Sequence, residues 1–154
     1  MKEKSVIHGT FTIERNYPTT PQRVFAAFSD PVKKQRWFSD PDESPIDEFE
    51  MDFRVGGKEL KRFQVTKLGF VCTSHTVYLD IVPDSRIVFA YTMSAGDIRF
   101  SSSQATVELF ASEVGTLLIF TEQGAYFEGA DGPQLREGGW RQLLDQLATE
   151  LAHI

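Results

Sequence analysis

The sequence predicts an α+β fold in which a curved antiparallel sheet of about six or seven strands wraps around one long C-terminal helix. Three observations predict it. Most of residues 48–124 alternates apolar and polar side chains over segments of strand length. The last part of the chain carries an apolar stripe at helical spacing, and two short helical segments follow the first strand. A helix that closes an aromatic-rich sheet usually leaves a cavity, so this fold suggests a place for an apolar ligand.

The N-terminal part predicts a strand followed by a helix pair. The strand is expected over His8–Tyr17, where apolar and polar residues alternate. Thr20 is suited to cap the next helix, and Pro21 suits its first position because the missing N–H is not needed there. Asp30-Pro31 ends this helix, and a second short helix covers residues 32–38.

The middle of the chain predicts an acidic loop and then a series of strands. Residues 39–47 are acidic and interrupted by prolines, which indicates a loop, and its position next to Trp37-Phe38 makes it a candidate gate to the cavity. Strands over 48–55 and 58–66 flank Gly56-Gly57, a strong hairpin signal. Further strands are expected over residues 70–82, 86–94, 100–112 and 116–125.

The C-terminal part predicts the helix that closes the sheet. An aromatic turn broken by glycines, residues 125–133, leads into a helix over Gly138–Ile154. Its apolar stripe, at spacings that share one helical face, is Trp140, Leu143, Leu144, Leu147, Ala148 and Leu151.

Composition excludes several classes of function. The net charge of −6 leaves no electrostatic footprint for nucleic acid or an anionic membrane. Cys72 is the only cysteine, which excludes an internal disulfide and a cysteine-based zinc site. No apolar run reaches membrane-spanning length and no signal-peptide core precedes the first strand, so a cytoplasmic protein without membrane insertion is expected.

The aromatic content leaves two interpretations open. The chain has 13 Phe, 4 Tyr and 2 Trp, which fits either a lined pocket or a well-filled aromatic core. We expect no metal and no cofactor, because the three histidines lie on different elements and no HExxH or phosphate-loop motif occurs.

The order of elements resembles the helix-grip fold of the START-like (SRPBCC) superfamily. Residues 21–31 followed by 36–38 are similar to its opening helix pair, and residues 82–91 to its central hairpin. Residues 121–129 followed by Gly139-Trp140 are similar to its last strand and grip helix. The match is to the bacterial branch named after the activator of heat-shock protein 90 ATPase. The resemblance implies a single START-like domain over 1–154, with a ligand cavity as the feature common to the superfamily rather than one reaction.

Strand parity predicts which side chains face the cavity, because alternate residues of a strand share a face. On residues 70–82, the face with Val71 and Val77 also carries His75. Elsewhere, Ser101 or Ser103 and Glu122 would meet His75 and Arg99 near one end of the cavity. The residues expected to contact a ligand are Trp37, Phe53, His75, Phe89, Tyr91, Arg99, Phe120, Glu122, Tyr126, Trp140 and Leu144.

The function expected from these observations is the binding of a small hydrophobic or aromatic ligand between the sheet and the C-terminal helix, with no assigned reaction. One alternative is a polyketide cyclase or hydratase-like enzyme, for which Glu122 is a weak catalytic candidate because burial would raise its pKa. Another is a protein-interaction module with a chaperone partner. A homodimer is a further expectation. A serine hydrolase is disfavoured, because no Gly-x-Ser-x-Gly elbow occurs.

Overall fold

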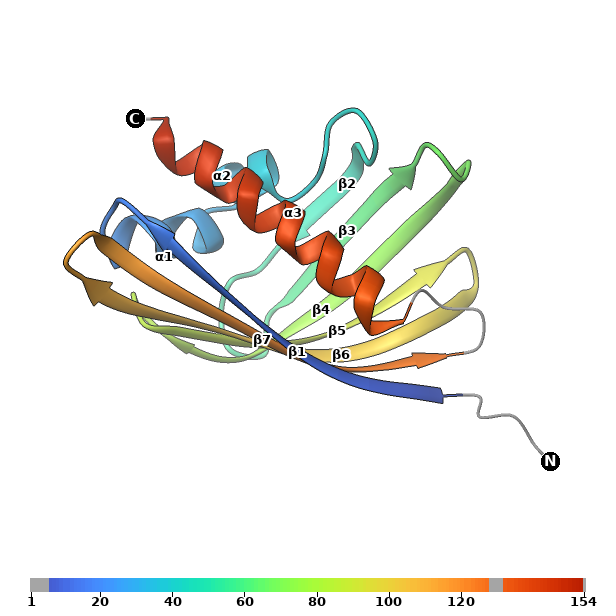
Figure 1. Cartoon of the computed structure of the whole chain (residues 1–154). Coiled ribbons are helices and arrows are strands. Elements are labelled where there is room, and N and C mark those ends of the chain that lie inside the picture. Colours follow the sequence, from blue (N-terminus) through green and yellow to red (C-terminus); the bar gives the residue numbers. More distant parts are fainter. Residues whose placement is uncertain (1–5, 128–131, 154) are drawn as a thin grey trace.

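The computed structural model describes residues 6–127 and 132–153. It contains one seven-stranded antiparallel sheet in the order β1-β7-β6-β5-β4-β3-β2. The strands are β1 (Val6–Tyr17), β2 (Ile46–Met51), β3 (Lys58–Val65), β4 (Phe70–Val82), β5 (Arg86–Ala95), β6 (Ile98–Ser112) and β7 (Gly115–Phe127). The helices are α1 (Pro21–Ser29), α2 (Pro31–Trp37) and α3 (Pro133–Ala152). The sheet curves around α3, while α1 and α2 lie near one end of that helix (Figure 1). The α+β fold and its helix-grip arrangement are therefore confirmed.

The helix pair forms for the reasons that the sequence indicates. The Thr20 side chain accepts a hydrogen bond from the Arg23 N–H at the start of α1, and the Asp30 side chain accepts from the N–H groups of Val32 and Lys33 at the start of α2. Each helix has a proline in its first turn, where no intrahelical N–H bond is needed.

Helix α3 begins earlier than the sequence suggested. Its first residue is Pro133, and Gly132 precedes it with a φ of 85°. The pair Gly138-Gly139 therefore lies inside the helix, although glycine weakens a helix interior. Part of the expected turn over 125–133, namely residues 128–131, lies outside the described residues. The longer helix extends the buried stripe by one turn and adds Arg136 to it.

The expected inward faces of three strands are confirmed. The structure buries Phe89 and Tyr91 on β5, Ser101 and Ser103 on β6, and Glu122 on β7. Together with the inner faces of α1, α2 and α3 they enclose the core, whose fully buried members include Val24, Phe120, Leu144 and Leu147.

The inward face predicted for β4 is wrong. Ser74 and Thr76 point inward and are buried, while His75 and Val77 are exposed on the outer face. The outer face of β4 is more apolar than its inner face, so a prediction that places the more apolar face inward is wrong for this strand. Arg99, at the start of β6, is also exposed. Its strand shifts register against β5 at Met93 and Ser94, and this irregularity separates the parity of Arg99 from that of Ser101.

Candidate functional site

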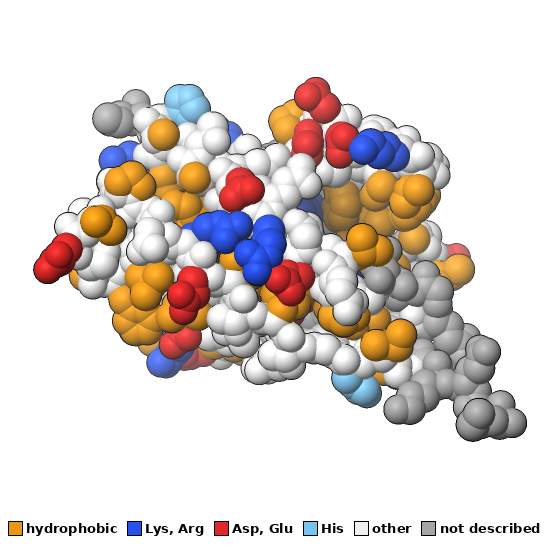
Figure 2. Space-filling view, viewed as in Figure 1, with side chains coloured by type: hydrophobic (Ala, Val, Ile, Leu, Met, Phe, Trp, Pro, Cys, Tyr) orange, Lys and Arg blue, Asp and Glu red, His pale blue; other side chains and the backbone are white. Residues whose placement is uncertain are grey.

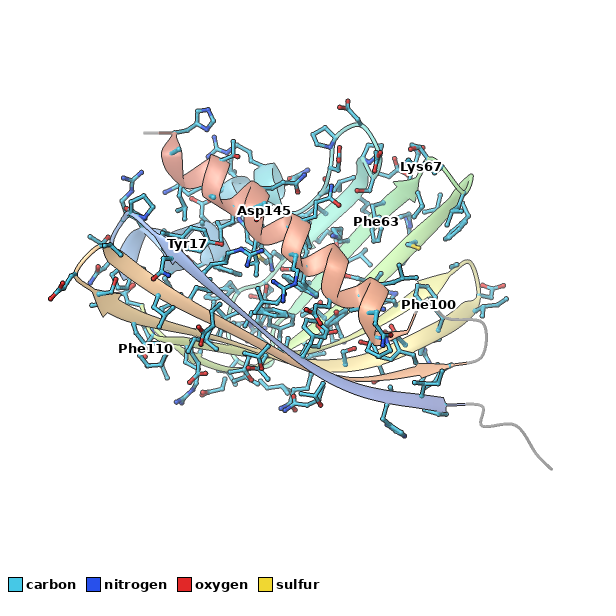
Figure 3. All side chains as sticks on the ribbon, viewed as in Figure 1. Tyr17, Phe63, Lys67, Phe100, Phe110 and Asp145 are labelled. Carbon is cyan, nitrogen blue, oxygen red and sulfur yellow. The ribbon has the colours of Figure 1, made fainter. Side chains whose placement is uncertain are left out.

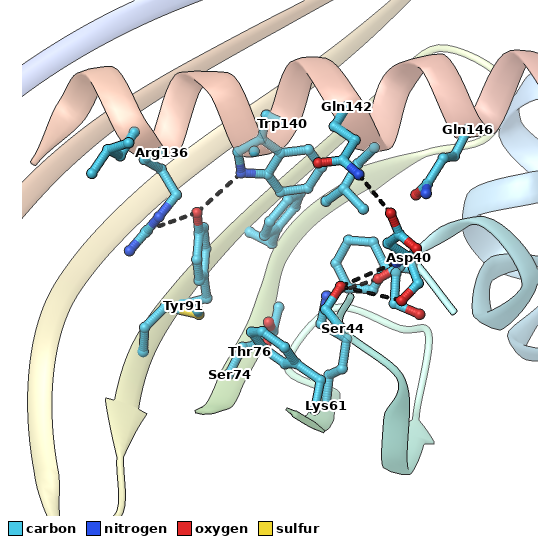
Figure 4. A pocket seen from close by; sticks show the side chains of 18 residues that line it. Asp40, Ser44, Lys61, Ser74, Thr76, Tyr91, Arg136, Trp140, Gln142 and Gln146 are labelled. Carbon is cyan, nitrogen blue, oxygen red and sulfur yellow. Dashed lines mark hydrogen bonds between the residues drawn. The ribbon is translucent and has the colours of Figure 1, made fainter. Parts of the chain in front are cut away.

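A pocket of about 210 Å³ lies between α3, the loop that follows α2, and the inner faces of β3, β4 and β5. Figure 2 shows the opening of this pocket as a hollow beside α3. The sheet contributes aromatic, hydroxyl and cationic side chains, and α3 contributes one long wall (Figures 3 and 4). The lining residues are Phe38, Ser39, Asp40, Ser44, Lys61, Phe63, Ser74, Thr76, Phe89, Tyr91, Met93, Leu135, Arg136, Gly139, Trp140, Gln142, Leu143 and Gln146.

Trp140 joins the pocket wall to the aromatic core. Its ring centroid lies 4.2 Å from that of Phe120 and 6.3 Å from that of Phe89. The indole N–H donates a hydrogen bond to the Tyr91 hydroxyl over 3.1 Å. Core packing on one face and a hydrogen bond at the edge together hold this ring in one orientation.

Tyr91 is the centre of a buried polar network at one end of the pocket (Figure 4). Its hydroxyl donates to Glu122 Oε1 over 2.7 Å and accepts from Arg136 Nη1 over 3.0 Å and from the Trp140 indole. One donor and two acceptor positions are all that a hydroxyl offers, so Tyr91 is saturated. Burial raises the pKa of this phenol well above its usual range, which keeps it neutral.

Arg136 connects α3 to the sheet through this network. Its Nη2 donates to Ser101 Oγ over 2.7 Å, and its Nη1 lies 3.7 Å from Glu122 Oε2. Burial raises the pKa of Glu122, whereas the hydrogen bond from Tyr91 and the charge of Arg136 lower it. Glu122 is fully buried and does not line the pocket, but it contacts the pocket residues Tyr91 and Arg136. The ion pair between Arg136 of α3 and Glu122 of β7 therefore holds α3 against the sheet.

Lys61 forms a second polar group at the pocket, on β3 and apart from this network (Figure 4). Its side chain is buried, and Nζ donates to the Phe38 carbonyl oxygen over 2.8 Å. Nζ also lies 3.8 Å from the centroid of the Phe38 ring and 4.6 Å from that of Phe63. Burial lowers the pKa of Lys61 to about 7; the charge of Glu59 opposes this shift and that of Lys34 adds to it.

The neighbouring carboxylate of Glu59 is already paired. Glu59 Oε1 accepts from Lys34 Nζ over 2.6 Å and from the Tyr78 hydroxyl over 2.5 Å. Among the described residues, Lys61 therefore has no carboxylate at ion-pair distance.

The structure brings some of the predicted site residues to the pocket and leaves others away from it. Phe89, Tyr91 and Trp140 line it. Glu122 and Tyr126 lie next to Arg136 behind the wall, where the guanidinium carbon is 5.3 Å from the Tyr126 ring centroid.

The remaining predicted residues serve the core or the surface. Trp37 is buried and donates its indole N–H to the Ala27 carbonyl oxygen, and Phe53 packs against Tyr78. Phe120 supports Trp140 from behind, and Leu144 lies fully buried beside Tyr17.

Two exposed residues correct the sequence prediction. His75 and Arg99 do not reach the pocket, for the reasons of parity and register given above.

Sequence reasoning missed the two cations of the pocket. Arg136 precedes Trp140 by four residues and so continues the same helical stripe, a signal that the glycine pair concealed. Glu59, Lys61 and Phe63 alternate along β3, and charged residues on what becomes the buried face of a strand were the available signal for Lys61.

The described residues hold neither a cluster of metal ligands nor a membrane-spanning helix. Within residues 6–127 and 132–153, no group of three or more histidine, cysteine or carboxylate side chains could hold a metal ion. In the same ranges, no helix is long and apolar enough to cross a membrane.

A curved antiparallel sheet that grips a long C-terminal helix defines a helix-grip protein of the SRPBCC type. The family described as "Activator of Hsp90 ATPase homolog 1-like protein" matches residues 18–152, and the chain belongs to this family.

Solved structures of similar proteins share the fold over nearly the whole chain. A protein from Rhizobium loti is 50% identical, with a TM-score of 0.86 and coverage of 96% of this chain and 99% of that one. A protein from Rhizobium leguminosarum is 36% identical, with a TM-score of 0.91 and coverage of 97% and 98%. A third, from Chromobacterium violaceum, is 30% identical, with a TM-score of 0.76 and coverage of 91% and 95%. A search among curated proteins found no match.

Proposed function

We propose that this protein binds a small, largely apolar molecule in the pocket between α3 and strands β3–β5. The observation that carries the proposal is that the inward faces of β3 and β4 are polar where they meet the pocket. Lys61, Ser74 and Thr76 are buried on the inner face of the sheet, and all three line the pocket. Polar groups buried beside a cavity are costly unless they have a partner, and a ligand can supply one.

The remaining wall suits an apolar body. Phe89, Met93, Trp140 and Leu143 line the same space. An engineered cavity of about 150 Å³ accepts benzene, so a pocket of about 210 Å³ suits a ring or branched chain with a short polar extension. The loop after α2 closes one side of it, where Asp40 Oδ2 accepts a hydrogen bond from Gln142 of α3 over 3.0 Å. This contact supports the proposal that the loop gates the pocket.

Two adjacent glycines of α3 provide a matched test. Gly139 lines the pocket and Gly138 does not, and a Cβ added at either position meets no atom within 4 Å. We expect Gly139→Phe to fill the pocket and Gly138→Phe to leave it open. Both changes remove a glycine from a helix interior, so neither is expected to weaken the helix itself.

The experiment begins with native mass spectrometry of freshly purified protein, followed by thermal-shift assays with small aryl and aliphatic acids, amides and alcohols. The proposal expects a copurifying compound or a saturable stabilisation that Gly138→Phe retains and Gly139→Phe loses. A clean apo mass with no stabilisation by any compound would refute it and favour a protein partner. Equal binding by the two variants would place the ligand elsewhere.

A further inference from the structure

The buried charges of the described part of the chain do not balance. Among the described residues, the buried ionisable side chains that carry formal charge are three cations and two carboxylates: Lys34, Lys61, Arg136, Glu59 and Glu122. Lys34 pairs with Glu59, and Arg136 with Glu122. Lys61 is left over at the pocket wall, where it lies beside the Lys34–Glu59 pair but has no carboxylate of its own at ion-pair distance among the described residues. An unpaired buried charge is strongly disfavoured, so either an anion pairs with Lys61 or the Lys61 amine is neutral.

The contacts of Lys61 leave room for a ligand. An ammonium group has three N–H donors, and one is used, on the Phe38 carbonyl oxygen. The aromatic rings of Phe38 and Phe63 offset part of the charge but accept no conventional hydrogen bond. Ser74, which pairs with Lys61 across β3 and β4, and Thr76 supply hydroxyl donors on the same wall.

Three other ionisable groups near Lys61 affect its charge, and the only carboxylate among them is paired with another residue. On β3, Glu59 is held by Lys34 and by a tyrosine hydroxyl. From β4, the buried Cys72 favours the charged form of Lys61, and from α2, Lys34 opposes it.

Two more charged groups line the same pocket from other elements. Asp40, in the loop, accepts from the Gln142 amide through Oδ2 and from the N–H groups of Asp42 and Glu43 through Oδ1. Arg136, on α3, is bound to the network around Glu122. Neither is paired with Lys61 among the described residues.

From this arrangement we infer that the ligand is a monoanionic carboxylic acid with a compact apolar body, and that its carboxylate pairs with Lys61. The inference rests on the proposed function and specifies the ligand class of the same pocket. The carboxylate would accept from the two free donors of Nζ and from the hydroxyls of Ser74 and Thr76. The apolar body would lie against Phe89 and Trp140.

Binding of such an acid has a proton linkage. Because burial lowers the pKa of Lys61 to about 7, the amine is mostly neutral in the free protein above that pH. A carboxylate beside Nζ favours the ammonium form, so binding above about pH 7 takes up a proton. Affinity for the acid should then fall by roughly 20-fold between about pH 6.5 and pH 8.5, whereas affinity for a neutral analogue should not change.

Titration calorimetry with acid and amide pairs tests the inference: benzoate, 3-phenylpropanoate and octanoate against their amides. At about pH 6.5 the best acid should bind roughly tenfold or more tightly than its amide. At about pH 8 its binding heat should depend on the ionisation enthalpy of the buffer, with an uptake of about 0.9 proton for each ligand. If acids and amides bind equally, the inference is overturned and the proposed function stands. If no compound binds, both fail.

Variants at one strand separate charge from folding. Lys61→Met should abolish the preference for the acid, so that an acid and its amide bind this variant with similar affinity. Lys61→Arg should keep the preference but lose the pH dependence, because a guanidinium does not titrate in this range. Lys58→Met removes an exposed lysine from the same strand and should change neither. A pH dependence that persists in Lys61→Arg, or an acid preference that persists in Lys61→Met, would contradict the role of Lys61.

Discussion

We expect the buried Lys61 amine to make the free energy of unfolding rise with pH above about 7. Its pKa falls from 10.5 to about 7 on folding. Between these values the unfolded chain binds more protons than the folded protein, so the free energy of unfolding rises with pH. Most lysines that gain a partner on folding act in the opposite sense, because their folded pKa is raised.

The magnitude follows from the shift. One pKa unit corresponds to about 1.4 kcal/mol, so the charged form of Lys61 opposes folding by about 5 kcal/mol below pH 7. Raising the pH from about 7 to about 9 lets the folded protein discharge this amine and should recover about 2 kcal/mol. Lys61→Met removes the titration and should remove this gain.

Urea unfolding of the wild-type protein, Lys61→Met and the exposed control Lys58→Met at about pH 7 and pH 9 measures the effect. The difference in unfolding free energy between wild type and Lys61→Met should shift by about 2 kcal/mol in favour of the wild type at the higher pH. The control should follow the wild type at both values. Parallel profiles for all three proteins would show that the Lys61 amine keeps an ordinary pKa and would refute the reasoning.

Three further predictions concern the buried network, the core and the loop. Glu122→Gln leaves the Arg136 charge buried without its counter-charge and should lower the unfolding free energy by about 3 kcal/mol in urea. Leu147→Ala, at a fully buried position, should cost about 3 kcal/mol, measured in the same way. Gln142→Ala removes the contact to Asp40 and should change stability by less than about 1 kcal/mol while ligand association and dissociation both become faster in stopped-flow mixing; unchanged rates would argue against a gating loop.

The sequence predicted the fold well where each element has one clearly apolar side. The alternation along β7 and the stripe at Trp140, Leu144 and Leu147 are of this kind, and the structure buries those residues. The helix pair was predictable from Thr20 and the two proline starts, because capping depends on residues close in sequence.

The candidate site was less predictable, because a pocket breaks the rule that the inward face is the more apolar one. On β4 the inner residues Ser74 and Thr76 are polar, whereas the outer residues Val77 and Leu79 are 37% and 45% exposed. A prediction that places the more apolar face inward therefore chose the outer face of β4, and it wrongly placed His75 in the pocket because His75 shares that face. The pairing of Lys61 with Ser74 depends on the register of β3 against β4, which no local pattern in the chain specifies.

The positions of the two tryptophans supply an optical probe of the pocket. Trp140 lines it, and Trp37 is buried beside Ala27 and Phe28 and outside the lining. A ligand against the indole of Trp140 should change its fluorescence, while the emission of Trp37 stays constant as a background. Trp37→Phe would leave a single emitter at the pocket wall, so occupancy could be followed in the unlabelled protein by its intrinsic emission alone.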